Sequence, residues 1–180
     1  VILYANPLPV LHIDDWLHAA VQPGIFTIIL DEIADPHNFG AIVRSACAMG
    51  ASSVIFGKHR SAPLSSAALK SAAGAMEYIP LVQVTNLVKE FATLKNAGFW
   101  IAGLDAKATK VLWEEDLTCK LALVVGSEGK GLRRLVREAC DFLISIPVSE
   151  SISSLNASIS AAIALTECVR QRSSLHENLL

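Results

Sequence analysis

Residues Leu121–Ile159 read LALVVGSEGKGLRRLVREACDFLISIPVSESISSLNASI, and this stretch decides the fold. It predicts a buried strand, a glycine-rich turn with one acidic residue, a basic helix, a second buried strand and a serine-rich turn that opens another helix. In open α/β sheets, ligands bind where polar turns follow the carboxyl ends of neighbouring strands. The stretch therefore predicts a ligand site built from its two turns.

The rest of the chain continues this alternation of strands and helices. Strands are expected at Phe26–Leu30, Ser53–Phe56, Pro80–Val84, Phe99–Leu104, Leu121–Gly126 and Phe142–Ile146. Helices are expected at Val10–Ala20, Asn38–Met49, Leu64–Ala73, Leu87–Asn96, Leu132–Ala139 and Ser154–Arg172. This order predicts an α/β domain over residues 25–173, with about six mainly parallel strands and helices on both faces. Residues 1–24 are expected to be a linker or hinge from a missing N-terminal domain, and residues 174–180 a tail.

The composition narrows the class of protein. The 180 residues are 52% hydrophobic and 18% charged, which is too apolar for a disordered chain. The apolar runs are only strand-length, so no membrane span is expected. A formal net charge of −2 argues mildly against a nucleic-acid protein, although local patches can still contact phosphates. The four cysteines lack C-x-x-C spacing and predict reduced core residues in a cytoplasmic protein, and no cluster has the spacing of metal ligands.

An earlier segment, Leu30–Gly50, adds an Asn and an Arg in a similar setting. Asn38 follows a turn and is expected to cap the next helix. Arg44 shares a helical face with small residues, Gly40 and Ala41 among them, where another backbone, a subunit or a polyanion can approach. Its planar guanidinium suits bidentate contacts with phosphate.

The glycine-rich turn Gly126–Gly131 matches neither the P-loop nor the G-x-G-x-x-G fingerprint. Three glycines in six residues still indicate unusual backbone dihedrals or a ligand close to the backbone. Glu128 lies either in a ligand site or simply in a tight turn near the positive end of a helix. The arginines of the following helix form either a solvated face or a face that contacts phosphates.

The serine-rich turn offers more polar groups than a helix cap requires. Residues 149–156 read SESISSLN, and one serine is enough to cap the last helix. Capping does not explain Asn156 in the first turn. This turn therefore predicts a second wall of the site.

The three segments together resemble the SpoU-type RNA ribose 2′-O-methyltransferases of the SPOUT superfamily. The first family motif, D-P-x-N-x-G followed by R, matches Asp35, Pro36, Asn38, Gly40 and Arg44. The second, G-S/A-E-G-x-G, matches Gly126–Gly131. The third, I-P followed by S-L-N-x-S, matches Ile146, Pro147, Ser154, Leu155, Asn156 and Ser158. The resemblance covers residues 26–172, and RSA at 60–62, SAAGAMEYIPL at 71–81 and VRQR at 169–172 are most similar to the branch acting on guanosine of large-subunit (23S) ribosomal RNA.

The resemblance implies a SPOUT-type α/β fold with a C-terminal trefoil knot, which general connection rules disfavour. It implies that the turns of the knot hold the cofactor S-adenosylmethionine. The cofactor-binding residues implied are Gly126, Ile146 and Leu155, with Gly103 and Leu104 nearby. It also implies an RNA partner, a homodimer that pairs through the knot region and completes each active site from both subunits, and an N-terminal RNA-binding domain in many members.

The predicted activity is methyl transfer to a ribose 2′-hydroxyl. The family treats Arg44 as catalytic; because a guanidinium stays protonated in proteins, we expect it to grip a phosphate and stabilise the developing alkoxide, with transient proton transfer through it left open. The other expected site residues are Asn38 and Asn156, which orient the hydroxyl and Arg44, Glu128, which fixes Arg44 or accepts a substrate donor, and Ser154, which holds a turn or contacts substrate. Two alternatives stay open: the same chemistry on tRNA, and a non-catalytic RNA-binding or ribosome-assembly factor. A Rossmann-type methyltransferase is disfavoured, because here the first strand leads into DEIADPHN instead of a glycine-rich turn.

Overall fold

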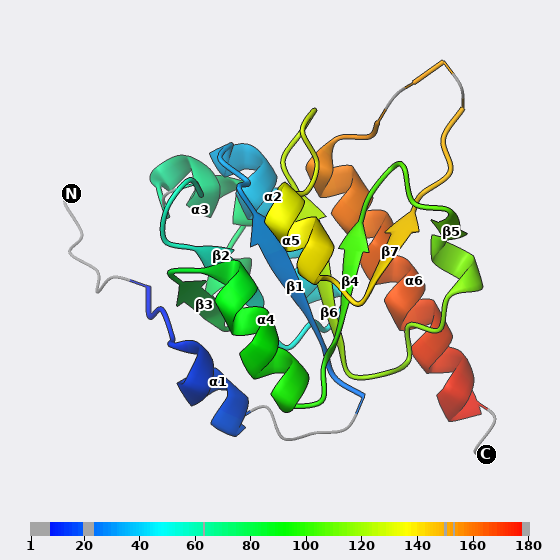
Figure 1. The fold of residues 1–180 in the computed structure, drawn as a ribbon. Helices are drawn as coiled ribbons and strands as arrows, with labels where there is room; N and C mark the ends of the chain where they lie inside the picture. Colours follow the sequence, from blue (N-terminus) through cyan, green and yellow to red (C-terminus); the bar gives the residue numbers. More distant parts are fainter. Residues whose placement is uncertain (1–7, 20–23, 63, 150, 153, 178–180) are drawn as a thin grey trace, which may run out of the picture.

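Seven strands form one parallel sheet within the residues that the computed structural model describes, 8–19, 24–62, 64–149, 151–152 and 154–177 (Figure 1). They are β1 Phe26–Asp31, β2 Val54–Gly57, β3 Leu81–Val84, β4 Trp100–Leu104, β5 Lys110–Val111, β6 Leu121–Gly126 and β7 Phe142–Ser145. Their order across the sheet is β3-β2-β1-β6-β4-β7-β5, and every pairing is parallel. The parallel α/β sheet expected from the sequence is confirmed.

The seventh strand, β5, corrects the expected count of six. It has two residues and pairs with β7 at the edge of the sheet, with the Ser145 hydroxyl donating to the Lys110 carbonyl at 3.1 Å. Two partly exposed residues give no apolar run, so pairing with β7 and not local preference creates this strand.

Helices cover both faces of the sheet. They are α1 Ile13–Ala19, α2 Pro36–Ala48, α3 Ser66–Ala72, α4 Leu87–Asn96, α5 Arg134–Ala139 and α6 Ala157–Glu177, with short 3-10 helices at Ala75–Glu77 and Leu112–Glu114. In Figure 1, α1, α4 and α5 lie in front of the sheet and α2, α3 and α6 behind it. Each face has its own apolar cluster, centred on Leu30 and Phe39 behind the sheet and on Ile29 and Phe91 in front. The central strands β1 and β6 are buried along their whole length, as expected for a sheet covered on both faces.

Helix α1 lies within the helix expected at Val10–Ala20. Within the segment expected to be a linker, Ile13 and Trp16 of α1 are buried against the front cluster. The Leu11 carbonyl also accepts from the Gln83 amide of β3 at 3.1 Å. At the other end, α6 continues to Glu177, beyond the expected end at Arg172. None of the described helices is long and apolar enough to cross a membrane.

The start of α2 is capped by Asp35 and not by Asn38, which corrects the expectation from sequence. The Asp35 carboxylate accepts from the backbone amides of His37 and Asn38 at 3.1 and 3.3 Å, and Pro36 occupies the first helical position. Asn38 is only 8% exposed, and its side chain is left for another partner.

The small residues of α2 serve packing within this chain. A Cβ atom on Gly40 would lie within 3.0 Å of the side chain of Ser71 and the backbone of Ala68 and Ala72, all on α3. The sequence left open whether another backbone, a subunit or a polyanion approaches this face of the helix. At Gly40, the element that approaches is α3 of the same chain.

The thiols of Cys140 and Cys168 are expected to resist alkylation in the folded protein. All four cysteines are free, as predicted. Burial raises the pKa of the Cys140 thiol to about 12 and that of the Cys168 thiol to about 11. Both thiols therefore stay protonated at mildly alkaline pH. Since the thiolate is the form that reacts, alkylation of both is slow. Iodoacetamide labelling read by peptide mass spectrometry should modify them only after denaturation; rapid labelling of Cys140 in the native protein would contradict this packing.

Candidate functional site

The main pocket lies where β4, β6 and β7 end side by side. It has a volume of about 450 Å³ and is lined by the loops that follow these three strands and by the start of α6. Apolar walls come from Leu104, Ile146 and Leu155, and polar walls from the backbone of the glycine-rich loop. In the sheet, β4 lies between β6 and β7. The two turns of residues 121–159, which follow β6 and β7, therefore lie close together at the carboxyl ends of these strands. We call this cavity the main pocket.

The glycine-rich loop folds back over the end of β6. A Cβ atom on Gly126 would lie within 3.0 Å of the backbone of Gly131 and Leu132, so the chain passes directly over this residue. The Gly131 amide donates to the Ser127 carbonyl at 2.8 Å and closes the loop. Gly129 and Gly131 have φ angles of 74° and 67°, a conformation that favours glycine. The glycines therefore shape the pocket wall, as the sequence indicated.

Charged groups also line the main pocket. Asp105, directly after β4, forms an ion pair with Arg137 of α5 at 2.6 Å and also accepts from the Lys107 amide at 2.8 Å. Lys107 and Lys130 line the same cavity. The pocket therefore offers both signs of charge beside its apolar walls.

Three of the predicted site residues, Asn38, Glu128 and Asn156, are joined by hydrogen bonds. The side-chain amide nitrogen of Asn156 donates to Asn38 Oδ1 at 3.0 Å and to Glu128 Oε1. The Asn156 Oδ1 atom accepts from the Ser158 amide, the Ser158 hydroxyl and the Ile159 amide at 2.8, 2.6 and 3.3 Å, so Asn156 caps α6. Its amide is fully used within the protein. The Asn38 amide nitrogen, in contrast, has no hydrogen-bond partner among the described residues.

Most other predicted residues lie at the main pocket. Gly126, Leu104, Ile146, Leu155 and Ser154 line it, as Glu128 does. Gly103 does not, because its Cα faces Leu132, Leu143 and Cys140 on the front of the sheet.

Arg44 lies outside the main pocket of its own chain. It is exposed on α2, six residues or about 9 Å along the helix axis from Asn38. Its guanidinium makes no hydrogen bond or ion pair with a described residue, and the expected contact with Glu128 is not formed.

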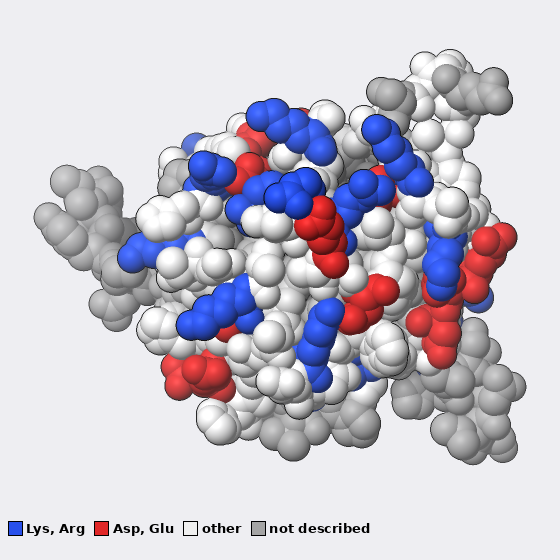
Figure 2. All heavy atoms as spheres, viewed as in Figure 1, with Lys and Arg blue, Asp and Glu red and all other residues white. Residues whose placement is uncertain are grey.

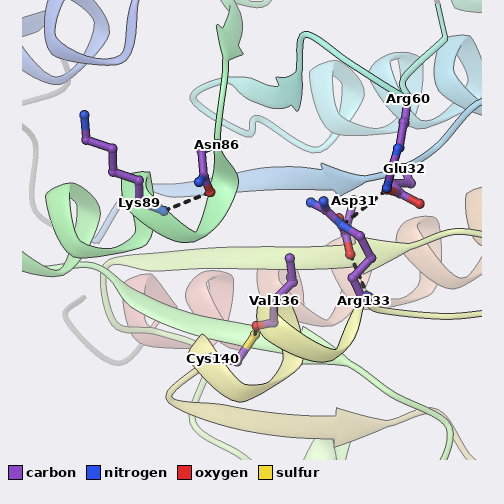
Figure 3. A network of polar contacts seen from close by, with 8 residues as sticks. All are labelled: Asp31, Glu32, Arg60, Asn86, Lys89, Arg133, Val136 and Cys140. Atoms are coloured by element: carbon purple, nitrogen blue, oxygen red, sulfur yellow. Dashed lines mark hydrogen bonds and ion pairs between the residues drawn. The ribbon is translucent and has the colours of Figure 1, made fainter.

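The structure adds a contact that the sequence did not indicate, between Asp31 and Arg133 (Figure 3). Asp31 is fully buried at the end of β1, paired in register with Gly126. Its carboxylate accepts from the Arg133 Nε at 2.6 Å and from the Arg133 amide at 2.8 Å. This pair ties the end of the glycine-rich loop to the sheet. The partners are 102 residues apart in the sequence. The sequence offered one sign of this contact, an acidic residue directly after an apolar strand.

A metal centre finds no support in the described part of the chain, where no group of three or more His, Cys, Asp or Glu side chains is placed to hold a metal ion.

Comparison with known proteins identifies the family. A model of the SpoU rRNA Methylase family matches residues 25–166. The 23S rRNA (guanosine-2′-O-)-methyltransferase RlmB of Escherichia coli strain K12 is 48% identical over 168 residues, 93% of this chain and 66% of that protein. The enzyme of the same name from Pseudomonas putida is 44% identical over 162 residues, 90% of this chain and 65% of that protein. This chain thus spans about two thirds of the length of these curated relatives.

Solved structures agree with this grouping. The SpoU methyltransferase AviRb from Streptomyces viridochromogenes, in complex with the cofactor AdoMet, is similar with a TM-score of 0.84 and 30% identity, covering 92% of this chain and 66% of that one. The TrmH/SpoU tRNA modifying enzyme of A. aeolicus has a TM-score of 0.77 and 27% identity, covering 91% and 85%. Because the family model matches most of its residues, the chain belongs to the SpoU rRNA methylase family.

Proposed function

We propose that this protein transfers a methyl group from S-adenosylmethionine to the ribose 2′-hydroxyl of a guanosine in 23S ribosomal RNA. The observation that carries the proposal is the main pocket, with Asn38, Glu128 and Asn156 bonded together beside it. The names of the relatives at 44–48% identity support the guanosine and the ribosomal RNA. A cytoplasmic location is part of the proposal, because ribosomal RNA is the substrate.

The residues of the main pocket fit S-adenosylmethionine. A volume of about 450 Å³ lies within the range of small-molecule sites. The apolar side chains of Leu104, Ile146 and Leu155 and the backbone around Gly126 suit a purine ring. The mixed charges around Asp105 suit an amino-acid group and a sulfonium. When bound, this cofactor supplies an electrophilic methyl carbon.

The protein's own tasks are to position the ribose and to favour loss of the hydroxyl proton. Asn38 has an uncommitted amide nitrogen that can donate to a ribose or phosphate oxygen. The second carboxylate oxygen of Glu128 can accept from the RNA, since the first is bonded to Asn156. Asn156 itself acts as a positioning residue, because its amide is already saturated. Ser154 lines the pocket and can contact the substrate.

Arg44 completes the site from a second subunit in this proposal. Its guanidinium lies away from the pocket of its own chain and makes no contact within it. Val148, Ile152 and Ile159, exposed beside the main pocket, supply apolar surface for a homodimer. There the Arg44 of one subunit would hold the phosphate next to the target ribose of the other.

A trefoil knot through the β6–α6 region is also part of the proposal. The chain leaves β6, passes β4 to form β7, and returns with α6 packed on α2 and β6. This path supports a knot around the main pocket.

Replacing Asn156 with aspartate separates its two roles. Asp keeps an oxygen that caps α6 but loses the amide donor and brings a second carboxylate next to Glu128. We expect turnover to fall at least about 10-fold and the free energy of unfolding to fall by about 1–2 kcal/mol, because Asn38 Oδ1 loses its donor. Asn156→Ala removes the cap as well and should cost about 1 kcal/mol more. Methyl-transfer assays and urea unfolding measure both; full activity in Asn156→Asp would contradict the positioning role.

The proposed function is tested by deleting the gene and mapping 2′-O-methyl groups on all RNAs of the organism. The expected result is loss of one methyl group from a guanosine of 23S ribosomal RNA, restored by the gene but not by its Arg44→Ala variant. Loss of a tRNA methyl group would support the tRNA alternative. An unchanged map would favour a non-catalytic RNA-binding or ribosome-assembly factor.

A further inference from the structure

A second cavity opens at the carboxyl ends of β2 and β3, between the starts of α4 and α5. Its volume is about 580 Å³, and its described lining includes three arginines and no acidic residue. We call it the arginine pocket, after Arg60, Arg133 and Arg134; His59 and Asn86 also line it. None of these residues lines the main pocket.

Two acidic residues behind the arginine pocket hold the guanidinium groups in place (Figure 3). Asp31 binds the Arg133 Nε at 2.6 Å, and Glu32 binds the Arg60 NH1 at 3.0 Å and the Arg133 Nε at 3.6 Å. In Figure 3, Arg133 extends from these carboxylates toward the side on which Asn86 lies. The NH1 and NH2 groups of Arg133 have no partner among the described residues. Arg133 is thus fixed in position with donors to spare, which lowers the entropy cost of binding an anion. The third guanidinium, that of Arg134, is held by Glu138 of its own helix at 2.9 Å.

The arginine pocket and the main pocket both lie at the carboxyl ends of the strands. Leu132 lines the main pocket and the next residue, Arg133, lines the arginine pocket. The strands below the two cavities, β6 and β2, are separated only by β1, a span of about 10 Å. Figure 2 shows Lys and Arg side chains gathered around this edge near α5, with acidic side chains among them. One polyanion can therefore reach both cavities.

We propose that the arginine pocket binds a backbone phosphate of the RNA substrate outside the reacting nucleotide. The guanidinium fork matches phosphate oxygens in a bidentate manner. Phosphate contacts position an RNA strand without reading its sequence. The identity of the polymer rests on the proposed function, but the anion site rests on the geometry of the cavity.

The test uses Arg60→Gln and Arg134→Gln in the full chain. Both side chains are 75% exposed, so neither change leaves a buried charge unpaired, as removal of Arg133 from Asp31 would. The matched control is Arg170→Gln, because Arg170 pairs with Glu167 of its own helix, as Arg134 does with Glu138, but lies on α6. The probe is an unmodified transcript of the organism's 23S ribosomal RNA, titrated without cofactor at several salt concentrations.

Each pocket variant is expected to raise the Kd for RNA about 3- to 10-fold at low salt and to lower the slope of log Kd against log salt by about 0.7–0.9. The KM for RNA should rise with kcat unchanged, since the contact exists before and during the reaction. Kd values and slopes equal to those of Arg170→Gln would overturn the proposal, as would a fall in kcat at unchanged KM. A wild-type chain that binds RNA with the expected slopes but transfers no methyl group would refute the proposed function and still support the phosphate site.

Discussion

Replacing Arg44 with alanine is expected to lower the turnover of methyl transfer about 100-fold or more and to leave the affinity for S-adenosylmethionine unchanged. In the proposed mechanism Arg44 would stabilise charge developing on the ribose oxygen, while the residues that line the main pocket do not include it. Stability should change by less than about 0.5 kcal/mol, because the side chain is exposed and has no partner in its own chain. Single-turnover assays with saturating cofactor, together with calorimetric titration, measure both quantities.

Two further variants control this experiment. Arg44→Lys keeps the charge but loses the bidentate fork, so an intermediate rate is expected. Lys89→Ala removes an exposed cation from α4 and should leave turnover unchanged. Equal turnover in Arg44→Ala and the wild type would remove Arg44 from the mechanism.

Gly126→Ala is expected to weaken binding of S-adenosylmethionine about 10- to 100-fold. The added Cβ would lie within 3.0 Å of the backbone of Gly131 and Leu132. These backbone atoms cannot rotate away as a side chain could, so the loop that forms the pocket wall must move. Calorimetric titration of the variant measures the effect, and circular dichroism confirms that the sheet is intact.

Gly129→Ala is the control within the same loop. Gly129 has open space around its Cα, so an added methyl group meets no atom, although its φ of 74° makes alanine strained by about 1 kcal/mol. We expect a smaller loss of affinity than in Gly126→Ala. Similar losses of affinity in the two variants would mean that any change in loop conformation weakens cofactor binding. The close packing of the backbone over Gly126 would then have no special part in it.

Mixing Arg44→Ala with Gly126→Ala, at a cofactor concentration too low to fill the Gly126→Ala pocket, tests whether sites are shared between subunits. A dimer of one Arg44→Ala chain and one Gly126→Ala chain has one complete site if Arg44 acts across the interface. That site combines the intact pocket of the first chain with the intact Arg44 of the second. Activity should therefore return after the variants are mixed and allowed to exchange subunits. No recovery, with exchange demonstrated, would place Arg44 in the site of its own chain.

The parts of this structure that local sequence decides were predictable. Apolar strand-length runs bounded by turns located β1 and β6, and the glycines of 126–131 marked the loop over the main pocket. The free cysteines also followed from composition and spacing. These features depend on periodicity and backbone freedom, which one segment carries by itself.

Features that depend on distant partners were missed or misassigned. Asn38 was expected to be a helix cap because it fits that rule, but Asp35 fits it equally and lies one turn earlier. The true partner of Asn38, Asn156, is 118 residues away. The pairing of Asp31 with Arg133 and the two-residue strand β5 likewise exist only after the sheet has assembled. The resemblance implied that Gly103 lies near the cofactor; the sequence did not show that its lack of a side chain makes room for Leu132 and Cys140.

The most direct test of the central claim is calorimetric titration of the wild-type chain with S-adenosylmethionine, beside Gly126→Ala under the same conditions. The account predicts saturable binding to one site per chain, strongly weakened in the variant. Absence of binding at millimolar cofactor, or equal affinity in both proteins, would contradict a methyl-donor site beneath the glycine-rich loop.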